Sequence, residues 1–456
     1  MKDYIVVIGG GLAGSEAAYQ IAKQGIKVKL YEMKPMKFTE AHSNKDLAEI
    51  VCSNSFKSNL HTNACGLLKE ELRYLDSLLI KIADETQVPA GQALAVDRKL
   101  FAQRVTQEIE KNPLIEIIHE EVTNIEKFAQ DGIVIIATGP LTSEEMAKEI
   151  SKITGQDKLY FYDAAAPIVT KESIDFNIAF WGNRYEQEKQ KDETIEQWQN
   201  RIKNLEASYI NLPMNQEEYE RFCDELINAE GVVLHEFEKR EIFEGCMPVE
   251  VMAKRGLDTL RFGPLKPVGF DDPGRRPYAV VQLRQDDVDG MIFNIVGFQT
   301  NLKFGEQKRV FSMIPGLENA EFVKYGVMHR NTYINSTKLL DNTYNLKSNN
   351  NIYFAGQITG VEGYVESISS GMLASLNACQ KYKNKEKIIL PETTIIGALA
   401  KYISTENDKF QPMNANFGIV LTLDEKIKDK KIKYGKLADR ALVDLKEQYF
   451  TKKEKN

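Results

Sequence analysis

The first thirty-two residues of the chain constrain its fold more than any other stretch. An apolar run, Tyr4–Ile8, meets the sequence Gly-Gly-Gly-Leu-Ala-Gly at 9–14, and a helical pattern follows over 15–24. A second predicted strand at 26–31 then ends in Glu32. Strand, glycine turn, helix, strand and acid in this order are typical of the βαβ unit that binds a dinucleotide. A glycine turn with only a structural role is the less favoured alternative, because the flanking strands and the acid are in register.

Each position of the glycine turn has a mechanical role. Gly9 makes the tight turn, Gly11 lets the backbone approach a pyrophosphate, and Gly14 lets the helix pack against the sheet. The helix N-terminus presents free N–H groups and a partial positive charge to the phosphates. Glu32 stands eighteen residues after Gly14, where its carboxylate can accept hydrogen bonds from ribose hydroxyls. The predicted cofactor-binding residues of this unit are Gly9, Gly10, Gly11, Leu12, Ala13, Gly14 and Glu32.

Length and composition narrow the class of protein. A chain of 456 residues is too long for one ordinary core, so we expect two or three domains. With 43% hydrophobic and 27% charged residues it has a globular composition, and no apolar run is long enough to span a bilayer. The N-terminus enters the first strand without a basic region or cleavage site, which predicts a cytoplasmic protein with no membrane partner. The five cysteines lack zinc spacing and pairing, so we predict neither a metal site nor structural disulfides.

Two of the cysteines stand in surroundings that suit a reactive thiol. Cys52 lies in a polar stretch at 49–55, close in sequence to the first βαβ unit; the alternative is a loop that only caps a helix predicted at 66–79. Cys246 lies in a Gly-Cys-Met-Pro turn, and cations near it in sequence could favour its thiolate. Cys223, by contrast, falls on the apolar face of a predicted helix and is expected to pack as a small hydrophobe.

A basic block at 254–284 stands out in a chain of net charge −7. Aromatic, glycine and proline residues interrupt it, and we favour phosphate or polyglutamate binding over solvated or ion-paired side chains. The segment 185–205 predicts an amphipathic surface helix. The segment 423–456 predicts a lysine-rich helical tail that is either solvated or in contact with RNA. The predicted anion-binding residues are Lys254, Arg255, Arg275, Arg276, Arg284, His329 and Arg330.

A second strand, glycine turn and helix occur near the end of the chain. A predicted strand at 351–354 leads into Gly-rich residues 355–364, and the helix after them would point its positive end at a ligand. A buried strand that ends at Gly139 belongs to the same pattern. The intervening residues are therefore an insertion that divides the dinucleotide-binding fold. The further predicted cofactor-binding residues are Gly139, Gly356, Gln357, Gly363 and Tyr364.

Ten motifs along the chain resemble a single family. They are GGGLAGSEAA, LYEMKP, EIVCSNS, ALAVDR, ATGPLTS, FYDAAAPI, FEGCMPVEVMAKRG, RPYAVVQLRQ, YGVMHRNTYIN and FAGQITGVEGYVES, in this order. Together they resemble the folate- and FAD-dependent tRNA (uracil-5-)-methyltransferases of the TrmFO type, from Ile5 to about Gly418. We therefore expect an α/β fold: a Rossmann-like, discontinuous FAD domain of the two-dinucleotide-binding type with an inserted α+β domain. The expected boundaries are 1–165 and 331–456 for the FAD-binding domain with its helical tail, and 166–330 for the inserted substrate or RNA domain.

The resemblance also implies a reaction. It implies a bacterial cytoplasmic enzyme that methylates C5 of the T-loop uridine of tRNA (m5U54). The carbon would come from 5,10-methylenetetrahydrofolate and the electrons from NADPH or NADH through FAD. Cys52 and Cys246 are then the candidate catalytic thiols, one of which adds to C6 of uracil. The resemblance also implies that the predicted anion-binding residues at 254–284 and 329–330 bind RNA or folate. Two alternatives stay open: the same chemistry on a uridine of 23S rRNA, which an inserted helix at 185–205 could select, and a flavin module that binds RNA without methylating it.

Overall fold

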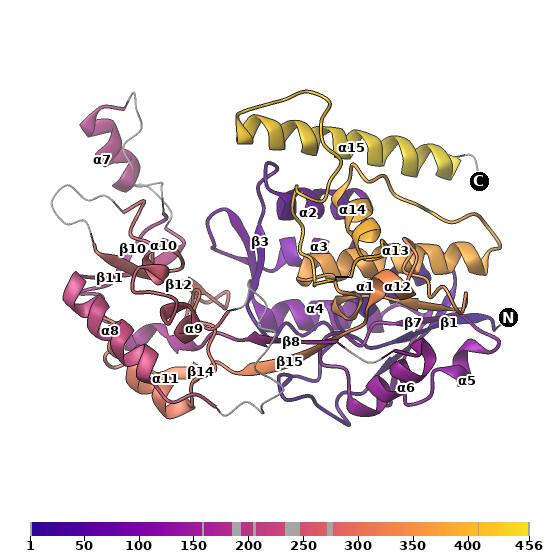
Figure 1. Cartoon of the computed structure of the whole chain (residues 1–456), viewed down its shortest axis with the longest axis horizontal. Helices are drawn as coiled ribbons and strands as arrows, with labels where there is room; N and C mark the ends of the chain where they lie inside the picture. The colour runs from indigo at the N-terminus through magenta and orange to yellow at the C-terminus, as the bar shows by residue number, and fades with distance from the viewer. Residues whose placement is uncertain are drawn as a thin grey trace.

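The computed structural model describes residues 2–156, 159–184, 193–203, 207–232, 247–270, 277–408 and 410–454. It has two sheet-centred parts side by side, joined by a pair of long strands, and a C-terminal helix that lies across one of them (Figure 1). No helix in the described ranges combines the length and the apolar character needed to cross a bilayer.

A five-stranded parallel sheet forms the centre of the larger part. Its strands are β1 (Tyr4–Ile8), β2 (Lys27–Glu32), β6 (Ile115–His119), β7 (Val134–Ile136) and β16 (Ile352–Phe354). They lie in the order β16-β7-β1-β2-β6. The β-branched runs that predicted β1 and β7 are buried on both faces, as strands of a covered parallel sheet must be. The last strand in sequence pairs with β7, so the end of the chain completes a sheet that its start begins.

Helices cover this sheet. They include α1 (Leu12–Lys23), α4 (Arg98–Glu110), α6 (Glu144–Thr154) and α13 (Tyr364–Tyr382), and α14 (Ile395–Tyr402) packs on α13. Helices α1 and α13 cross so closely that a Cβ on Gly371 would lie 2.3 Å from the carbonyl oxygen of Ala13. Asp97 caps α4, since its side chain accepts a hydrogen bond from the backbone N–H of Leu100 at 2.8 Å.

The single helix predicted at 66–79 is wrong. The structure has two helices there, α2 (Ala64–Tyr74) and α3 (Leu78–Glu85). Asp76 adopts a left-handed conformation with φ of 59°, which no α-helix can continue through. Ser77 then caps α3 by accepting a hydrogen bond from the N–H of Ile80. The apolar period continues across the break, and that continuity produced the error. A small sheet of β3 (Ser55–Ser58), β4 (Gln87–Val88) and β5 (Ala93–Val96) lies beside these helices.

The smaller part has its own sheet and its own core. The strands β9 (Ile168–Thr170), β10 (Phe180–Trp181), β11 (Tyr209–Met214), β12 (Ala279–Gln285), β13 (Ile292–Ile295) and β14 (Phe322–Lys324) lie in the order β10-β11-β12-β13-β9-β14. Helices α8 (Gln216–Asn228), α9 (Val249–Ala253), α10 (Thr259–Phe262) and α11 (Phe304–Phe311) accompany it. The buried face of α8 consists of Tyr219, Phe222, Cys223 and Leu226, which confirms that Cys223 packs as a core residue.

Two adjacent antiparallel strands connect the parts. β8 (Leu159–Ala164) enters the smaller part and β15 (Met328–Tyr333) leaves it, and the two pair along their whole length. One hydrophobic cluster contains residues on both sides of this pair in sequence, and a separate cluster contains residues between 166 and 320. We propose on this basis that the domain boundaries lie near 165 and 330, and we call residues 166–330 the inserted domain.

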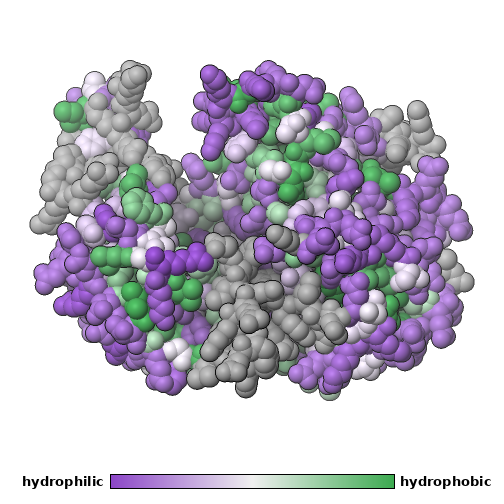
Figure 2. Space-filling view, viewed as in Figure 1, coloured by the Kyte–Doolittle hydropathy of each residue, from purple (hydrophilic) through white to green (hydrophobic). Residues whose placement is uncertain are grey.

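The predicted C-terminal helix is confirmed as α15 (Lys430–Glu454). It packs on α2 and buries Leu437, Ala438, Ala441 and Leu445. Its opposite, mainly hydrophilic face is turned outward (Figure 2). Within the segment 185–205, the structure describes α7 (Ile195–Lys203), which stands away from the body of the inserted domain (Figure 1); residues 185–192 and 204–206 lie outside the described residues. Between the lobe with α7 and helix α15 the surface is hollowed (Figure 2).

Candidate functional site

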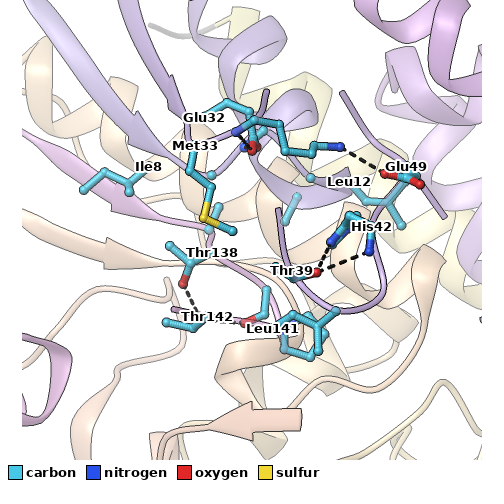
Figure 3. Close-up of a pocket in the computed structure, with 18 of the residues that line it drawn as sticks. Ile8, Leu12, Glu32, Met33, Thr39, His42, Glu49, Thr138, Leu141 and Thr142 are labelled. Carbon is cyan, nitrogen blue, oxygen red and sulfur yellow. Dashed lines mark hydrogen bonds and ion pairs between the residues drawn. The ribbon is translucent and has the colours of Figure 1, made fainter. Parts of the chain in front are cut away.

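An open pocket of about 1290 Å³ lies at the carboxyl ends of β1, β2 and β7, the edge of a parallel sheet where α/β folds bind ligands. Residues from both ends of the chain line it, and Figure 3 shows part of its wall. Of the predicted site residues, the wall contains Gly9, Gly10, Gly11, Leu12, Ala13, Glu32, Cys52, Gly139, Gln357 and Tyr364. Gly14, Gly356 and Gly363 lie behind it and shape the backbone.

The glycine turn has the geometry that a pyrophosphate requires. Gly9 has a φ of 102°, and a Cβ on Gly14 would lie 1.8 Å from the carbonyl oxygen of Gly9, so helix α1 can approach the strand only without a side chain there. A Cβ on Gly11 would meet no atom within 4 Å. The turn is therefore closely packed at Gly14, on the side of the helix, and open at Gly11, on the side of the pocket. The N-cap of α1 is Gly11, which has no side chain to cap the first N–H groups of the helix, so these groups are open to a ligand.

Glu32 holds this turn from below. Its carboxylate is buried and accepts hydrogen bonds from the backbone N–H of Gly10 at 2.8 Å and of Lys34 at 2.9 Å. Ribose binding by Glu32 stays a prediction, and the structure adds a second role that sequence spacing did not indicate. The side chain fixes the loop after β2 to the glycine turn.

We predict that Glu32→Ala weakens FAD binding by roughly tenfold or more, because it leaves the buried N–H of Gly10 without an acceptor. Titration of the apoprotein with FAD, followed by flavin fluorescence, measures the effect. Glu121→Ala is the matched control: Glu121 also lines the pocket, but its carboxylate pairs with Lys37 at 2.8 Å and not with the turn. FAD affinity undiminished in Glu32→Ala would contradict both roles of Glu32.

The loop after β2 supplies wall residues that the sequence analysis missed. Lys34 and Glu49 form a nearly buried ion pair with an Nζ–Oε2 distance of 3.2 Å, and Thr39 bonds to Nδ1 of His42 at 2.6 Å (Figure 3). Glu49 also accepts a hydrogen bond from the backbone N–H of Asn44 at 3.1 Å. These bonds turn a polar loop into a fixed wall. The sequence signal was the Met33-Lys34-Pro35 break after the strand, followed by the polar residues that surround His42 and Asn44.

Asn331 is another wall residue that the sequence analysis did not single out. It lies on β15, lines the pocket and is 2% exposed, yet its Nδ2 has no hydrogen-bond partner among the described residues. A buried amide donor is rarely left unpaired. Its position on the pocket wall fits a donor held for a bound ligand.

The second glycine turn meets the first across the pocket. Gly356 and Gly363 have φ values of 85° and 127°, and α13 begins at Tyr364 directly after them. A Cβ on Gly356 would lie 3.1 Å from that of Ala13. Gln357 bonds to Glu362 beside the turn. Two helix N-termini, those of α1 and α13, thus lie at one pocket, as an anionic dinucleotide with a redox ring requires.

Cys52 lies where these elements converge. The phenolic oxygen of Tyr364 accepts hydrogen bonds from the backbone N–H groups of Cys52 at 3.0 Å and Ser53 at 3.1 Å. The thiol of Cys52 contacts the carbonyl oxygen of Ala164, at the end of β8, at 3.4 Å. Burial raises the pKa of Tyr364 well above its usual range, so this hydroxyl stays neutral. The half-buried thiol is thereby set on the pocket wall, between the cofactor-type turns and the inserted domain.

The predicted basic residues divide into three groups. Lys254 and Arg255 are exposed at the end of α9. Arg284 departs from the prediction: it is 7% exposed and donates to the side-chain oxygens of Asn54 at 2.9 Å and Ser53 at 2.7 Å. It is a buried link between the inserted domain and the loop at 49–54, which we call the Cys52 loop, and not a surface cation for RNA. Arg275 and Arg276 lie outside the residues that the structure describes, and so do the side chains of His329 and Arg330. The second candidate thiol, Cys246, also lies outside the described residues.

Comparison with known proteins bears on this arrangement. A family model described as "Glucose inhibited division protein A" matches residues 4–386. A Fusobacterium nucleatum protein named methylenetetrahydrofolate--tRNA-(uracil-5-)-methyltransferase TrmFO is 58% identical over 98% of this chain and 99% of its own length. The chain belongs to the TrmFO family. The resemblance seen in the ten motifs is thus confirmed.

Other relatives agree with TrmFO membership. A protein of the same name from Acetivibrio thermocellus is 58% identical over 98% of this chain and 99% of its own length. Among solved structures, Aquifex aeolicus GidA matches 99% of this chain and 75% of its own with a TM-score of 0.67, at 17% identity. At that identity the likeness shows the fold alone. It confirms the predicted Rossmann-like α/β class for this TrmFO-family chain.

Proposed function

We propose that this TrmFO-family protein methylates C5 of a uridine in tRNA. Its carbon donor is 5,10-methylenetetrahydrofolate, its bound cofactor is FAD and its reductant is NADPH or NADH. One observation carries the proposal: Cys52, a candidate nucleophile, lines the same pocket as the glycine turn at 9–14. A thiol and a flavin site on one cavity suit a reaction that needs both nucleophilic catalysis and hydride transfer. A tRNA-modifying enzyme of this kind acts in the cytoplasm.

The chemistry explains the need for a thiol. C5 of uracil is a weak nucleophile until a thiolate adds at C6 and makes C5 an enolate carbon. C5 can then attack the methylene carbon of the folate and lose its proton. The bond between that carbon and the folate nitrogen breaks next, so that tetrahydrofolate leaves and an exocyclic methylene remains on C5. Two electrons and a proton, equivalent to hydride addition, convert the methylene to a methyl group as the thiolate leaves C6. Bound FAD would supply that hydride, having received it from NADPH or NADH.

The described residues have clear parts in this scheme. The open front of Gly11, the N-termini of α1 and α13 and the unpaired amide of Asn331 fit a bound dinucleotide. Tyr364 fixes the backbone of Cys52 beside it. We assign the reacting thiols to Cys52 and Cys246.

RNA must reach this pocket with its target base free of its stack. Exposed Lys254 and Arg255 and the outer face of α15 are the cationic surfaces that we assign to RNA or folate anions. The hollow between α15 and the lobe with α7 gives a polynucleotide room to lie between them (Figure 2).

The test is methylation by the purified, FAD-loaded protein. It is incubated with 5,10-methylenetetrahydrofolate, NADPH or NADH, and an unmodified transcript of either a tRNA or the 23S rRNA target region. Mass spectrometry of the digested RNA measures 5-methyluridine. We expect it in the tRNA T loop. Methylation of the rRNA alone would replace tRNA as the substrate, and its absence from both would leave a flavin module without this activity.

A further inference from the structure

A buried ion pair joins the Cys52 loop to the inserted domain. Arg98 is the first residue of α4, and its Nε and NH2 donate to the two carboxylate oxygens of Asp286 at 2.7 and 3.0 Å. The same guanidinium lies 3.3 Å from the carbonyl oxygen of Val51 and 3.5 Å from that of Cys52. The side chain of Asp286 is 2% exposed and that of Arg98 is 15% exposed. Arg98 and Asp286 therefore lie together against the backbone of the loop that contains Cys52.

Asp286 belongs to the inserted sheet. It directly follows β12, and its backbone N–H donates to Ile292 of the neighbouring strand at 3.0 Å. The two residues before it also bond to the Cys52 loop: Arg284 to Ser53 and Asn54, and the carbonyl oxygen of Gln285 to Asn54 at 2.8 Å. Three consecutive residues of one strand end thus hold the loop that contains Cys52. Any displacement of this sheet displaces the counter-charge of Arg98.

Several charged groups surround the thiol, and they come from different elements. Arg98 from α4 and Lys324 from β14 each interact electrostatically with Cys52, and Asp286 faces both of these cations. Glu49 lies near Lys324 on the other side, Tyr364 faces the thiol from α13, and Arg284 stands near Asp286 and Arg98. Burial opposes the charge of Arg98, but Asp286 outweighs it and raises the pKa of Arg98. Burial lowers the pKa of Lys324, and nearby Arg98 lowers it further.

We propose that Asp286 is a positioning residue, which acts through Arg98 to hold the Cys52 loop on the inserted sheet and to set how much positive charge the thiol faces. This inference rests on the proposed function, in which Cys52 is a reacting thiol. The thiolate, not the thiol, is the nucleophile, and a neighbouring cation favours it. Asp286 cancels part of that cation. The inserted domain thus contributes two charges near Cys52: the ammonium of Lys324, and the carboxylate of Asp286 that offsets Arg98.

The experiment measures the alkylation rate of Cys52 by iodoacetamide over a pH series. The protein is loaded with FAD, no RNA or folate is added, and mass spectrometry follows the peptide that contains Cys52. Asp286→Asn leaves the charge of Arg98 uncompensated, so we expect the profile to move to lower pH by about one unit. Because nucleophilicity falls with thiol basicity, the rate at neutral pH rises by only about threefold. Arg98→Met removes the cation, so its profile moves to higher pH.

The opposite signs separate this role from structural damage. Loss of packing would speed alkylation in both variants without moving their pH profiles apart. The matched control is Asp84→Asn, because Asp84 forms a similar bidentate ion pair with Arg73, at 2.8 and 2.7 Å, away from Cys52. The alkylation profile of Cys52 in this variant should not move. Asp286→Glu keeps the negative charge, so its pH profile should stay close to that of the unsubstituted protein. If Asp286→Asn does not fold, Arg98→Met gives the test from the other side.

Three results would overturn the proposal: profiles that move in the same direction in Asp286→Asn and Arg98→Met, profiles that do not move in either, or a Cys52 that is not alkylated at any pH. These outcomes are independent of RNA methylation. A protein that fails to methylate RNA but shows the opposite shifts would contradict the proposed function and leave the charge relation between Asp286 and Cys52 intact.

Discussion

Cys52→Ser is expected to lower the formation of 5-methyluridine at least about a thousandfold while FAD stays bound, because a hydroxyl cannot replace the thiolate in the pocket. Serine fits the site: the backbone N–H bond to Tyr364 does not involve the side chain, and the oxygen is smaller than the sulfur that contacts Ala164. The fold should therefore be retained. The measurement is the yield of 5-methyluridine with time, together with the flavin absorbance of the purified variant.

Cys65→Ser is the control for this substitution. Cys65 is buried in α2, its thiol contacts the carbonyl oxygen of Ala415 at 3.9 Å, and it does not line the pocket. Its replacement should leave methylation nearly unchanged. Full activity in Cys52→Ser would remove Cys52 from the reaction.

RNA that contains 5-fluorouridine separates the roles of the two candidate thiols. Fluorine at C5 cannot leave as a proton does, so the enzyme thiol stays bonded to C6. Loss of the covalent adduct in Cys52→Ser but not in Cys246→Ser assigns the attack on C6 to Cys52. The reverse pattern assigns it to Cys246 and gives Cys52 a later step. An undiminished adduct in both variants would exclude this pair of nucleophiles.

Gly14→Ala is expected to have the largest effect on stability. The added Cβ would lie 1.8 Å from the carbonyl oxygen of Gly9, and both groups belong to backbone that cannot move without separating α1 from the sheet. Overpacking of this kind costs about 3 kcal/mol or more of the free energy of unfolding. We expect a protein that unfolds at clearly lower denaturant concentration and does not retain FAD.

Gly11→Ala is the paired variant that tests the cofactor site alone. Gly11 has a φ of −73°, which alanine adopts readily, and its Cβ would meet no protein atom within 4 Å. The stability of the apoprotein should change by no more than about 1 kcal/mol. FAD affinity should fall at least tenfold, because the methyl group fills the space that the pyrophosphate needs. Denaturant unfolding of both apoproteins and FAD titration measure these effects. Equal stability of the two variants, or unchanged FAD affinity in Gly11→Ala, would contradict this account of the turn.

The first βαβ unit could be predicted from sequence because its determinants are local. Strand, glycine spacing, helix and acid all fall within thirty-two residues, and each acts through neighbouring backbone. The contact of Tyr364 with Cys52 spans 312 positions, and no periodicity reports a bond of that range. Asn331 escaped notice for the same reason. Its unpaired amide has meaning only once β15 is placed on the pocket wall.

The assignment of Arg284 shows how a local signal misleads. Basic neighbours in sequence suggested a surface patch, but β12 is buried along almost its whole length, on both faces. A strand in that position can include an arginine only if polar partners meet it, and Ser53 and Asn54 are those partners. The predicted helix at 66–79 failed through Asp76, whose left-handed backbone interrupts an otherwise continuous apolar period.

The parallel sheet is completed by β16, and the pocket by α13, which ends at Tyr382. During synthesis on the ribosome, β1 emerges first and can pair with β7. The strand that pairs with the other edge of β7 is β16, which emerges more than three hundred residues after β1. The inserted domain has all its sheet strands between Ile168 and Lys324, so it can form its core earlier. We expect translation to yield a folded inserted domain before the cofactor site exists, so that FAD is acquired only near the end of synthesis. A chain that stops before β16 and α13 would lack one strand of the parallel sheet and part of the pocket wall, so we expect it not to bind FAD.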